Sequence, residues 1–237
     1  MMQKLYQKSE LALALTLIGI YVVISSILMS LPAWMSSVFH VLMSVAILLF
    51  ILKNGHKEAY GLTLPKGSAK GYLFYLPLVV IISVNLWFGV KMEHSLPISI
   101  FQTISMLFVG FIEEIIFRGM LFQAIRKNSL KWAIIISSIT FGAGHIVNLI
   151  NGNAESILLN LCQIVYATAA GFLFVILFLK SASLIPCILT HSLVNALSVF
   201  SAPAPTLSGE ILTAAALTLV SALYALYLAF SLPGQKK

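Results

Sequence analysis

The side chains best suited to chemistry are two carboxylates and a guanidinium within six residues of one another. They are Glu113, Glu114 and Arg118, and they interrupt a run of apolar residues. On a helix Glu114 and Arg118 stand one turn apart with the acid first, which is the favourable order for an ion pair. Glu113 projects about 100° away from Glu114. The pattern therefore predicts a local ion pair and a second carboxylate that needs a partner on another element.

Two more apolar runs each contain a histidine followed by an asparagine about one turn later. His145 precedes Asn148, and His191 precedes Asn195. Each pair falls on one face of a helix. A carboxylate beside a neutral imidazole can deprotonate water, while an asparagine and a second histidine can donate hydrogen bonds to an oxyanion. These residue types together predict hydrolysis of an amide bond in a buried pocket.

The composition places these residues in a membrane. Of 237 residues, 60% are hydrophobic and 9% are charged, and the mean hydropathy is +1.02. A soluble domain carries about 25% charged residues. One core cannot hide this many apolar side chains, and the surface left over would exceed what soluble monomers expose. A water-soluble globule is excluded.

Apolar stretches near the length of about 20 residues that a spanning helix needs occur eight times. They cover residues 11–29, 34–52, 71–90, 96–122, 132–150, 157–179, 183–200 and 211–232. We therefore predict an all-α fold, a polytopic transmembrane helical bundle that forms one integral-membrane domain over residues 1–237. The first stretch is too long for the apolar part of a signal peptide, so we interpret it as a retained span. Cys162 and Cys187 lie inside such stretches and favour packing over a disulfide framework.

The basic residues divide unequally between the two sets of loops that alternate along the chain. Twelve of the fourteen fall in one set, Lys91 alone falls in the other, and Arg118 lies within a span. The twelve are Lys4, Lys8, Lys53, Lys57, Lys66, Lys70, Arg126, Lys127, Lys131, Lys180, Lys236 and Lys237. The positive-inside rule then predicts that both termini are cytoplasmic. This division explains the net charge of +7 as a topology signal, so we expect no nucleic-acid partner.

Counting from the basic residue that bounds each helix gives the depth of the polar groups. Glu113, His145 and His191 lie roughly 16 to 21 Å from the cytoplasmic boundary at 1.5 Å per residue, near the middle of a core about 30 Å thick. An ionisable group there costs at least about 2.5 kcal/mol and usually marks a functional site. Three helices therefore bring titratable groups to one level. Because hydrolysis consumes water, we expect a polar cavity that opens on the cytoplasmic side.

At these residues the sequence resembles the CPBP intramembrane proteases, which include type II CAAX prenyl endopeptidases and the bacteriocin-processing or self-immunity enzymes of the Abi family. Three motifs carry the resemblance over residues 111–195, within a catalytic core of approximately 96–200. They are Glu113-Glu114-x-x-x-Arg118, Phe141-x-x-x-His145 and His191-x-x-x-Asn195. The resemblance implies that Glu113 activates water with His145, that Glu114 and Arg118 support the site, and that His191 and Asn195 bind the oxyanion.

A metal site is a further expectation to examine. Glu113, His145 and His191 form a set of two histidines and one glutamate, which is a ligand set of catalytic zinc sites. Two features favour a reaction without Zn²⁺. The sequence has no His-Glu-x-x-His helix, and Arg118 already supplies positive charge near the carboxylates.

Three classes of function remain open at this point. The leading hypothesis is an intramembrane endopeptidase that acts on a membrane-associated peptide or a lipid-anchored protein. A transporter is the second, because buried carboxylates and histidines also form ion pathways, but it predicts an internal repeat that the sequence lacks. A non-enzymatic immunity protein is the third. We favour a bacterial plasma-membrane protein that matures a secreted peptide or confers bacteriocin immunity over prenyl-protein processing. The oligomeric state is not predicted.

Overall fold

The computed structural model describes residues 2–152 and 156–233, and the regular secondary structure of this part of the chain is helical. Lys236 and Lys237 of the sequence analysis lie outside it. Within these ranges no strand forms, and a single antiparallel bridge joins Val90 to Ser201. The prediction of an all-α fold is confirmed.

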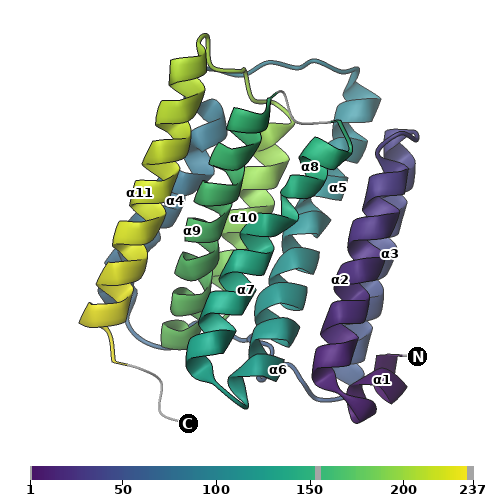
Figure 1. Cartoon of the computed structure of the whole chain (residues 1–237), viewed down its shortest axis with the longest axis vertical. Coiled ribbons are helices and arrows are strands. Elements are labelled where there is room, and N and C mark those ends of the chain that lie inside the picture. The colour runs from purple at the N-terminus through teal and green to yellow at the C-terminus, as the bar shows by residue number, and fades with distance from the viewer. Residues whose placement is uncertain (1, 153–155, 234–237) are drawn as a thin grey trace.

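The helices follow one another along the chain as Figure 1 shows. In order they are α1 (Met2–Lys8), α2 (Glu10–Leu28), α3 (Ala33–Lys53), η1 (Ala69–Tyr75), α4 (Leu76–Ser83), η2 (Val84–Leu86), α5 (Leu96–Glu114), η3 (Ile115–Leu121), α6 (Phe122–Arg126), α7 (Leu130–Gly144), α8 (Ile146–Ile150), α9 (Ile157–Ser181), α10 (Ile185–Ser198) and α11 (Leu207–Ser231).

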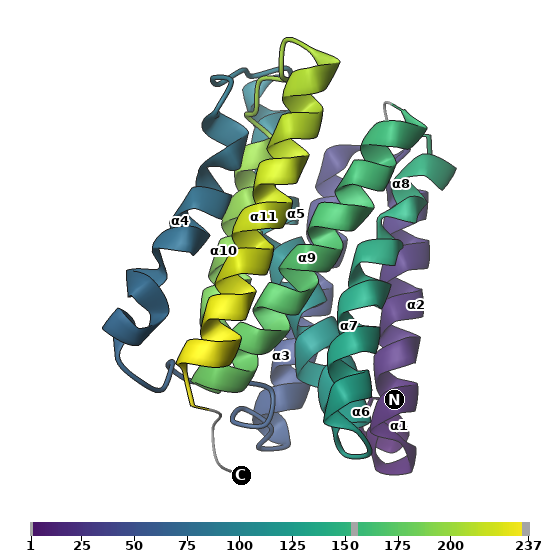
Figure 2. The same ribbon diagram turned by 60° about the vertical axis from the view of Figure 1, so that its left-hand side comes forward.

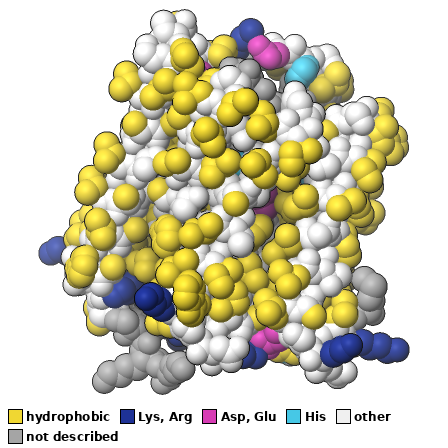
Figure 3. Space-filling view, in the orientation of Figure 1, with side chains coloured by type: hydrophobic (Ala, Val, Ile, Leu, Met, Phe, Trp, Pro, Cys, Tyr) yellow, Lys and Arg dark blue, Asp and Glu magenta, His cyan; other side chains and the backbone are white. Residues whose placement is uncertain are grey.

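Within the described ranges, seven helical segments are long and apolar enough to cross a bilayer. They match seven of the eight predicted spans. The eighth, α10, is apolar but has only 14 residues, which at 1.5 Å each is about 21 Å. Large apolar side chains remain exposed around the bundle, such as Phe230 at 85% and Leu42 at 63%, and Figure 3 shows them over much of one face. The protein is therefore an integral, multi-pass membrane protein.

The third predicted span is broken where the sequence analysis expected one helix. It consists of η1, α4 and η2, and the backbone is left-handed at Leu73, Phe74 and Tyr75. Pro77 stands in the first turn of α4, where its missing N–H costs no helical hydrogen bond. The helical periodicity of apolar residues does not reveal a break of this kind.

The helices form a bundle in which the hairpin of α2 and α3 occupies one side and α4 with α11 the other (Figures 1 and 2). Between them α5 packs against α3 and α10, and α9 packs against α7 and α11. Glycine permits the closest approach. A Cβ atom at Gly110 of α5 would lie 2.5 Å from the backbone nitrogen of Ser192 on α10. Small residues allow membrane helices to pack this closely.

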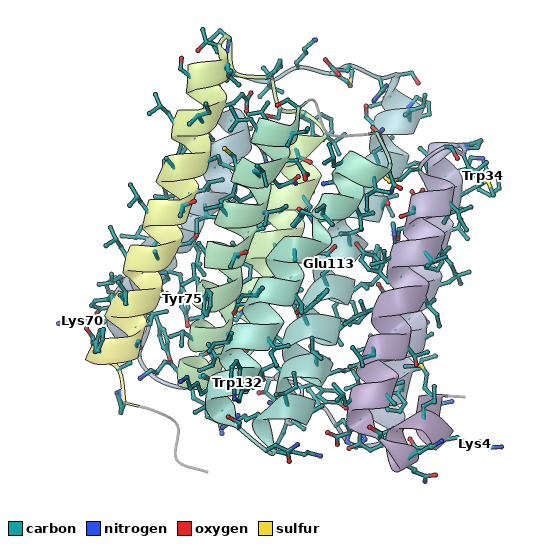
Figure 4. The ribbon with its side chains drawn as sticks, in the orientation of Figure 1. Lys4, Trp34, Lys70, Tyr75, Glu113 and Trp132 are labelled. Carbon is teal, nitrogen blue, oxygen red and sulfur yellow. The ribbon has the colours of Figure 1, made fainter. Side chains whose placement is uncertain are left out.

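The two ends of the bundle differ in charge. Dark blue Lys and Arg side chains gather at the lower end of Figure 3, and one stands at the upper end. Figure 4 places Lys4 and Lys70 at the lower end with Trp132, and Trp34 at the upper end. We call these the basic end and the Trp34 end. The N-terminus lies at the basic end, as does the end of α11 (Figure 1). That this end faces the cytoplasm stays a prediction.

Candidate active site

A change in helical winding follows directly after the two carboxylates. Helix α5 ends at Glu114, and the chain continues as η3, a π-helix in which all seven side chains are buried. π-helical turns are rare and often occur at functional sites. The sequence predicts a regular helix over residues 96–122, because apolar periodicity does not distinguish an α turn from a π turn.

Glu114 is the centre of a buried polar cluster. Its Oε1 atom accepts a hydrogen bond from Nη1 of Arg118 at 3.0 Å, and both side chains are fully buried. Nδ1 of His191 on α10 lies 2.8 Å from the same oxygen. An ionised carboxylate only accepts hydrogen bonds, so Nδ1 of His191 carries the proton in this contact. The predicted ion pair is confirmed, and it also holds a histidine from a distant helix.

Glu113 has partners on two other helices. The hydroxyl of Tyr21 on α2 donates to its Oε1 atom at 2.5 Å. Its Oε2 atom lies 3.5 Å from Nε2 of His191. The His191 ring therefore bridges the neighbouring carboxylates of Glu113 and Glu114. Glu113, which projects away from Glu114, therefore contacts residues on α2 and α10, as the motif predicts.

Tyr21 is a site residue that the motif analysis missed. It lies in the first apolar stretch, which contains no motif, and its hydrogen bond to Glu113 joins residues 92 positions apart. One signal was available, because a tyrosine in the middle of a span needs a partner for its hydroxyl. That signal does not say which residue the partner is.

Aromatic rings pack around the cluster. The guanidinium of Arg118 lies 3.9 Å from the centre of the Phe141 ring. The same ring meets His145 and His191 edge to face, with centroids 5.7 and 5.5 Å apart. A desolvated cation over an aromatic face gains about 2 kcal/mol. Phe141, the first residue of the second motif, thus connects all three motifs.

His145 stands where α7 ends and α8 begins. Its carbonyl accepts a hydrogen bond from the amide of Asn160 on α9 at 2.9 Å. Asn148, one turn later, donates to Oε1 of Gln163 at 2.9 Å. Asn160 and Gln163 thus join α9 to the segment around His145.

The four residues proposed as catalytic line one cavity of about 530 Å³ together with Tyr21. Glu113, His145, His191 and Asn195 come from α5, the α7–α8 junction and α10. Figure 4 places Glu113 between Trp34 and Trp132, near mid-height of the bundle. Figure 3 shows an acidic side chain at that height in an opening of the surface. The common depth that residue counting predicts agrees with this arrangement.

The cavity extends in the direction opposite to the one that the sequence analysis expected. From Glu113 its lining continues to Met29, Leu31 and Ala33 at the turn between α2 and α3, which is the Trp34 end. The expectation of an opening on the side of the basic loops is wrong for this cavity. The polar side chains that line the outer part of the cavity lie on the halves of the helices nearer the Trp34 end.

Another buried histidine lines the same cavity. Nδ1 of His40 on α3 lies 2.8 Å from Oγ of Ser105 on α5, and its Nε2 lies 3.0 Å from Oγ of Ser25 on α2. Both ring nitrogens are therefore engaged by hydroxyls. His40 thus joins α2, α3 and α5 beside the cavity.

The side-chain positions do not fit the zinc site considered above. Among residues 2–152 and 156–233, no group of three or more His, Cys, Asp or Glu side chains is arranged to hold a metal ion. Tyr21 and Glu114 contact Oε1 of Glu113 and Nδ1 of His191, and the remaining two atoms, Oε2 and Nε2, lie 3.5 Å apart.

Comparison with known proteins supports the reading of the motifs. Residues 95–197 match the family model described as type II CAAX prenyl endopeptidase Rce1-like. The match contains every motif residue and ends before α11, and the α2–α3 hairpin lies outside it. No curated protein and no solved structure matches the chain. Residues 95–197 are therefore similar to the Rce1-like type II CAAX prenyl endopeptidases, a family of proteases, in agreement with the resemblance of the motifs to the CPBP intramembrane proteases.

Proposed function

We propose that the protein is an intramembrane endopeptidase in which Glu113 and His145 activate water and His191 and Asn195 stabilise the oxyanion. The observation that carries this proposal is that all four side chains line one cavity near mid-height of the bundle. The protease family match favours a peptidase over the transporter that the sequence alone left open.

The proposed reaction begins when a water molecule between Glu113 and His145 gives a proton to the Glu113 carboxylate. The resulting hydroxide attacks the carbonyl carbon of the peptide bond, and the carbonyl oxygen becomes an oxyanion. His191 and Asn195 donate hydrogen bonds to that oxygen. Glu113 then passes its proton to the amide nitrogen as the C–N bond breaks. The products are a carboxylic acid and an amine, and Glu113 returns to its starting state.

Glu114 and Arg118 support this chemistry without touching the substrate. Glu114 accepts from Nδ1 of His191, which leaves Nε2 as the ring nitrogen nearest to Glu113. Arg118 balances the charge of Glu114 within a fully buried pair. Nε2 can donate to the oxyanion only when it also carries a proton, so His191 acts in this step as an imidazolium whose orientation Glu114 fixes.

The substrate class is a membrane-associated peptide or a lipid-anchored protein within the bilayer. More specifically, the protein matures a secreted peptide or confers bacteriocin immunity, and it does so in the plasma membrane of a bacterium. A non-enzymatic immunity protein is the alternative on the same scaffold. The two differ in whether the biological phenotype depends on Glu113.

The test uses purified protein in liposomes with a panel of membrane peptides that carry a fluorophore and a quencher. We expect Glu113→Ala and His145→Ala to lower cleavage by at least about 100-fold, because general acid–base groups contribute 10²–10⁴-fold. Glu93→Ala is the matched control, since Glu93 is an exposed loop residue paired with Lys91. Cleavage by the Glu113→Ala protein at the normal rate would remove the catalytic assignment.

A further inference from the structure

The outer part of the cavity is lined by uncharged side chains, both apolar and polar. The polar ones come from several helices at the Trp34 end, namely Ser25, Ser26, Ser36, Gln102, Asn148 and Ser198. None of the described residues that line the cavity is Lys, Arg or Asp, and Glu113 is the one acidic residue among them. This surface suits a peptide backbone and uncharged side chains, and it offers no cationic partner to an acidic substrate.

The length of this outer part limits what can reach the site. Tyr21 beside Glu113 and Met29 near the mouth are eight residues apart on or next to α2, so the path measures about 12 Å at 1.5 Å per residue. An extended chain covers about 3.3 to 3.6 Å per residue. About three or four extended residues therefore fill the path, whereas a folded domain cannot enter it.

We infer, on the basis of the proposed function, that the substrate is an extended, uncharged peptide segment that enters from the Trp34 end. The basic residues lie at the opposite end, and the positive-inside rule places that end in the cytoplasm. The substrate is therefore reached from the non-cytoplasmic side of the membrane. Its cleaved bond lies about three or four residues from where the segment leaves the membrane surface.

Cysteine labelling tests the direction of the mouth without requiring activity. Ser36 and Ser198 line the outer cavity, and Ser68 is an exposed loop residue before η1, where its side chain caps no helix. Each is replaced by Cys in a Cys162→Ala background, because Cys187 is fully buried. Spheroplasts are then treated with a membrane-impermeant maleimide. We expect Ser36→Cys and Ser198→Cys to react and Ser68→Cys to react only after lysis.

Reaction of Ser68→Cys in intact spheroplasts, with Ser36→Cys and Ser198→Cys protected, would overturn the direction of entry and leave the proposed peptidase intact. A second arm compares matched peptides with either two serines or two glutamates beside the cleaved bond. We expect the glutamate peptide to be cleaved with a kcat/KM at least about 10-fold lower, and equal values would overturn the substrate class.

The hydrogen bond between Tyr21 and Glu113 supports a second inference. Tyr21 lies outside residues 95–197, yet its hydroxyl is 2.5 Å from Oε1 of Glu113 and its side chain is buried. The other oxygen of Glu113 faces Nε2 of His191. We propose that Tyr21 is a positioning residue for the peptidase, because it holds one carboxylate oxygen and thereby directs the other toward the water to be activated.

The test replaces Tyr21 by Phe, which removes the hydroxyl and keeps the ring. A hydrogen bond to a charged group is worth about 1.5–3 kcal/mol, so we expect kcat to fall about 10- to 100-fold while KM stays within twofold. Tyr224→Phe is the matched control, since that hydroxyl is also buried but donates to the carbonyl of Tyr72 at 2.8 Å, away from the cavity.

A readout independent of activity separates positioning from general stability. A carbodiimide reacts with accessible carboxyl groups, and mass spectrometry locates the product on Glu113. We expect Tyr21→Phe to change the rate of this modification by at least about threefold and Tyr224→Phe to leave it unaltered. An unchanged modification rate together with an unchanged kcat would overturn the role of Tyr21, while a loss of activity in Glu113→Ala would still support the proposed function.

Discussion

Nδ1 of His191 on α10 lies 2.8 Å from Oε1 of Glu114 at the end of α5, and the same carboxylate oxygen accepts a hydrogen bond from Arg118. Two motifs that are 77 residues apart in the chain therefore meet at one oxygen atom. The buried ion pair of the first motif sets the position of the histidine of the third motif.

Removal of the Glu114 charge is expected to destabilise the bundle. Glu114→Gln leaves the fully buried guanidinium of Arg118 without a counter-charge, and breaking a buried pair in this way costs about 3–5 kcal/mol. The thermal unfolding midpoint in detergent measures the loss. Replacement of both partners, by Glu114→Leu with Arg118→Met, should recover part of the stability but not the activity. A Glu114→Gln protein with the unfolding midpoint of the wild-type protein would contradict the structural role of the ion pair.

The spacing between α5 and α10 depends on the absence of a side chain at Gly110. A Cβ atom there would lie 2.5 Å from the backbone nitrogen of Ser192, next to His191. Gly110→Ala should therefore push the helices apart, weaken the contact between Glu114 and His191, and lower both the unfolding midpoint and kcat. Gly19→Ala is the control, because nothing lies within 4 Å of its Cβ position and alanine stabilises a helix by about 0.5–1 kcal/mol. Equal unfolding midpoints and kcat values for Gly110→Ala and Gly19→Ala would show that the close approach of α5 and α10 does not matter for stability or activity.

Asn195 is expected to act on the transition state. Loss of one oxyanion donor lowers kcat by about 10²–10³-fold in other hydrolases, and Asn195→Ala should do the same with little change in KM. Steady-state kinetics with a membrane peptide measure both constants. Asn85→Ala is the control, since Asn85 donates to the carbonyl of Val194 at 2.7 Å as a contact between helices. If the two variants lost kcat equally, Asn195 would have only a packing role.

A chelator is expected to leave cleavage unchanged. The described side chains form no group suited to a metal ion, and Arg118 already supplies positive charge beside the carboxylates. The measurement compares the cleavage rate in liposomes before and after dialysis against EDTA. A loss of activity that added Zn²⁺ restores would show that Glu113, His145 and His191 rearrange into a metal site.

Local features of the site could be predicted from the residues alone. The ion pair between Glu114 and Arg118 depends on one turn of helix, and neighbours four residues apart meet whatever the rest of the fold does. The long apolar stretches likewise determine where helices form, since a bilayer core offers the backbone no other hydrogen-bond partners. The assembly of the motifs on one level followed from helix length, because the rise per residue is constant.

Contacts between helices could not be predicted in this way. The bond from Tyr21 to Glu113 and the contacts of His40 with Ser25 and Ser105 depend on how far each helix is rotated about its axis. Apolar residues surround these helices on nearly every side, so their pattern does not specify that rotation. The break at Leu73 to Tyr75 and the π turn after Glu114 were missed for a related reason, because both preserve the apolar run.

The amino-acid order was thus sufficient for the membrane location, the helical segments, the motif residues and their shared depth, since each follows from local geometry and the cost of transferring charge into lipid. The partners of Glu113 and the direction of the cavity emerged only from packing. The distribution of lysines predicts which end of the bundle faces the cytoplasm, but it says nothing about the end at which the helices diverge. That depends on side-chain volumes at every contact between α2, α3, α5 and α10.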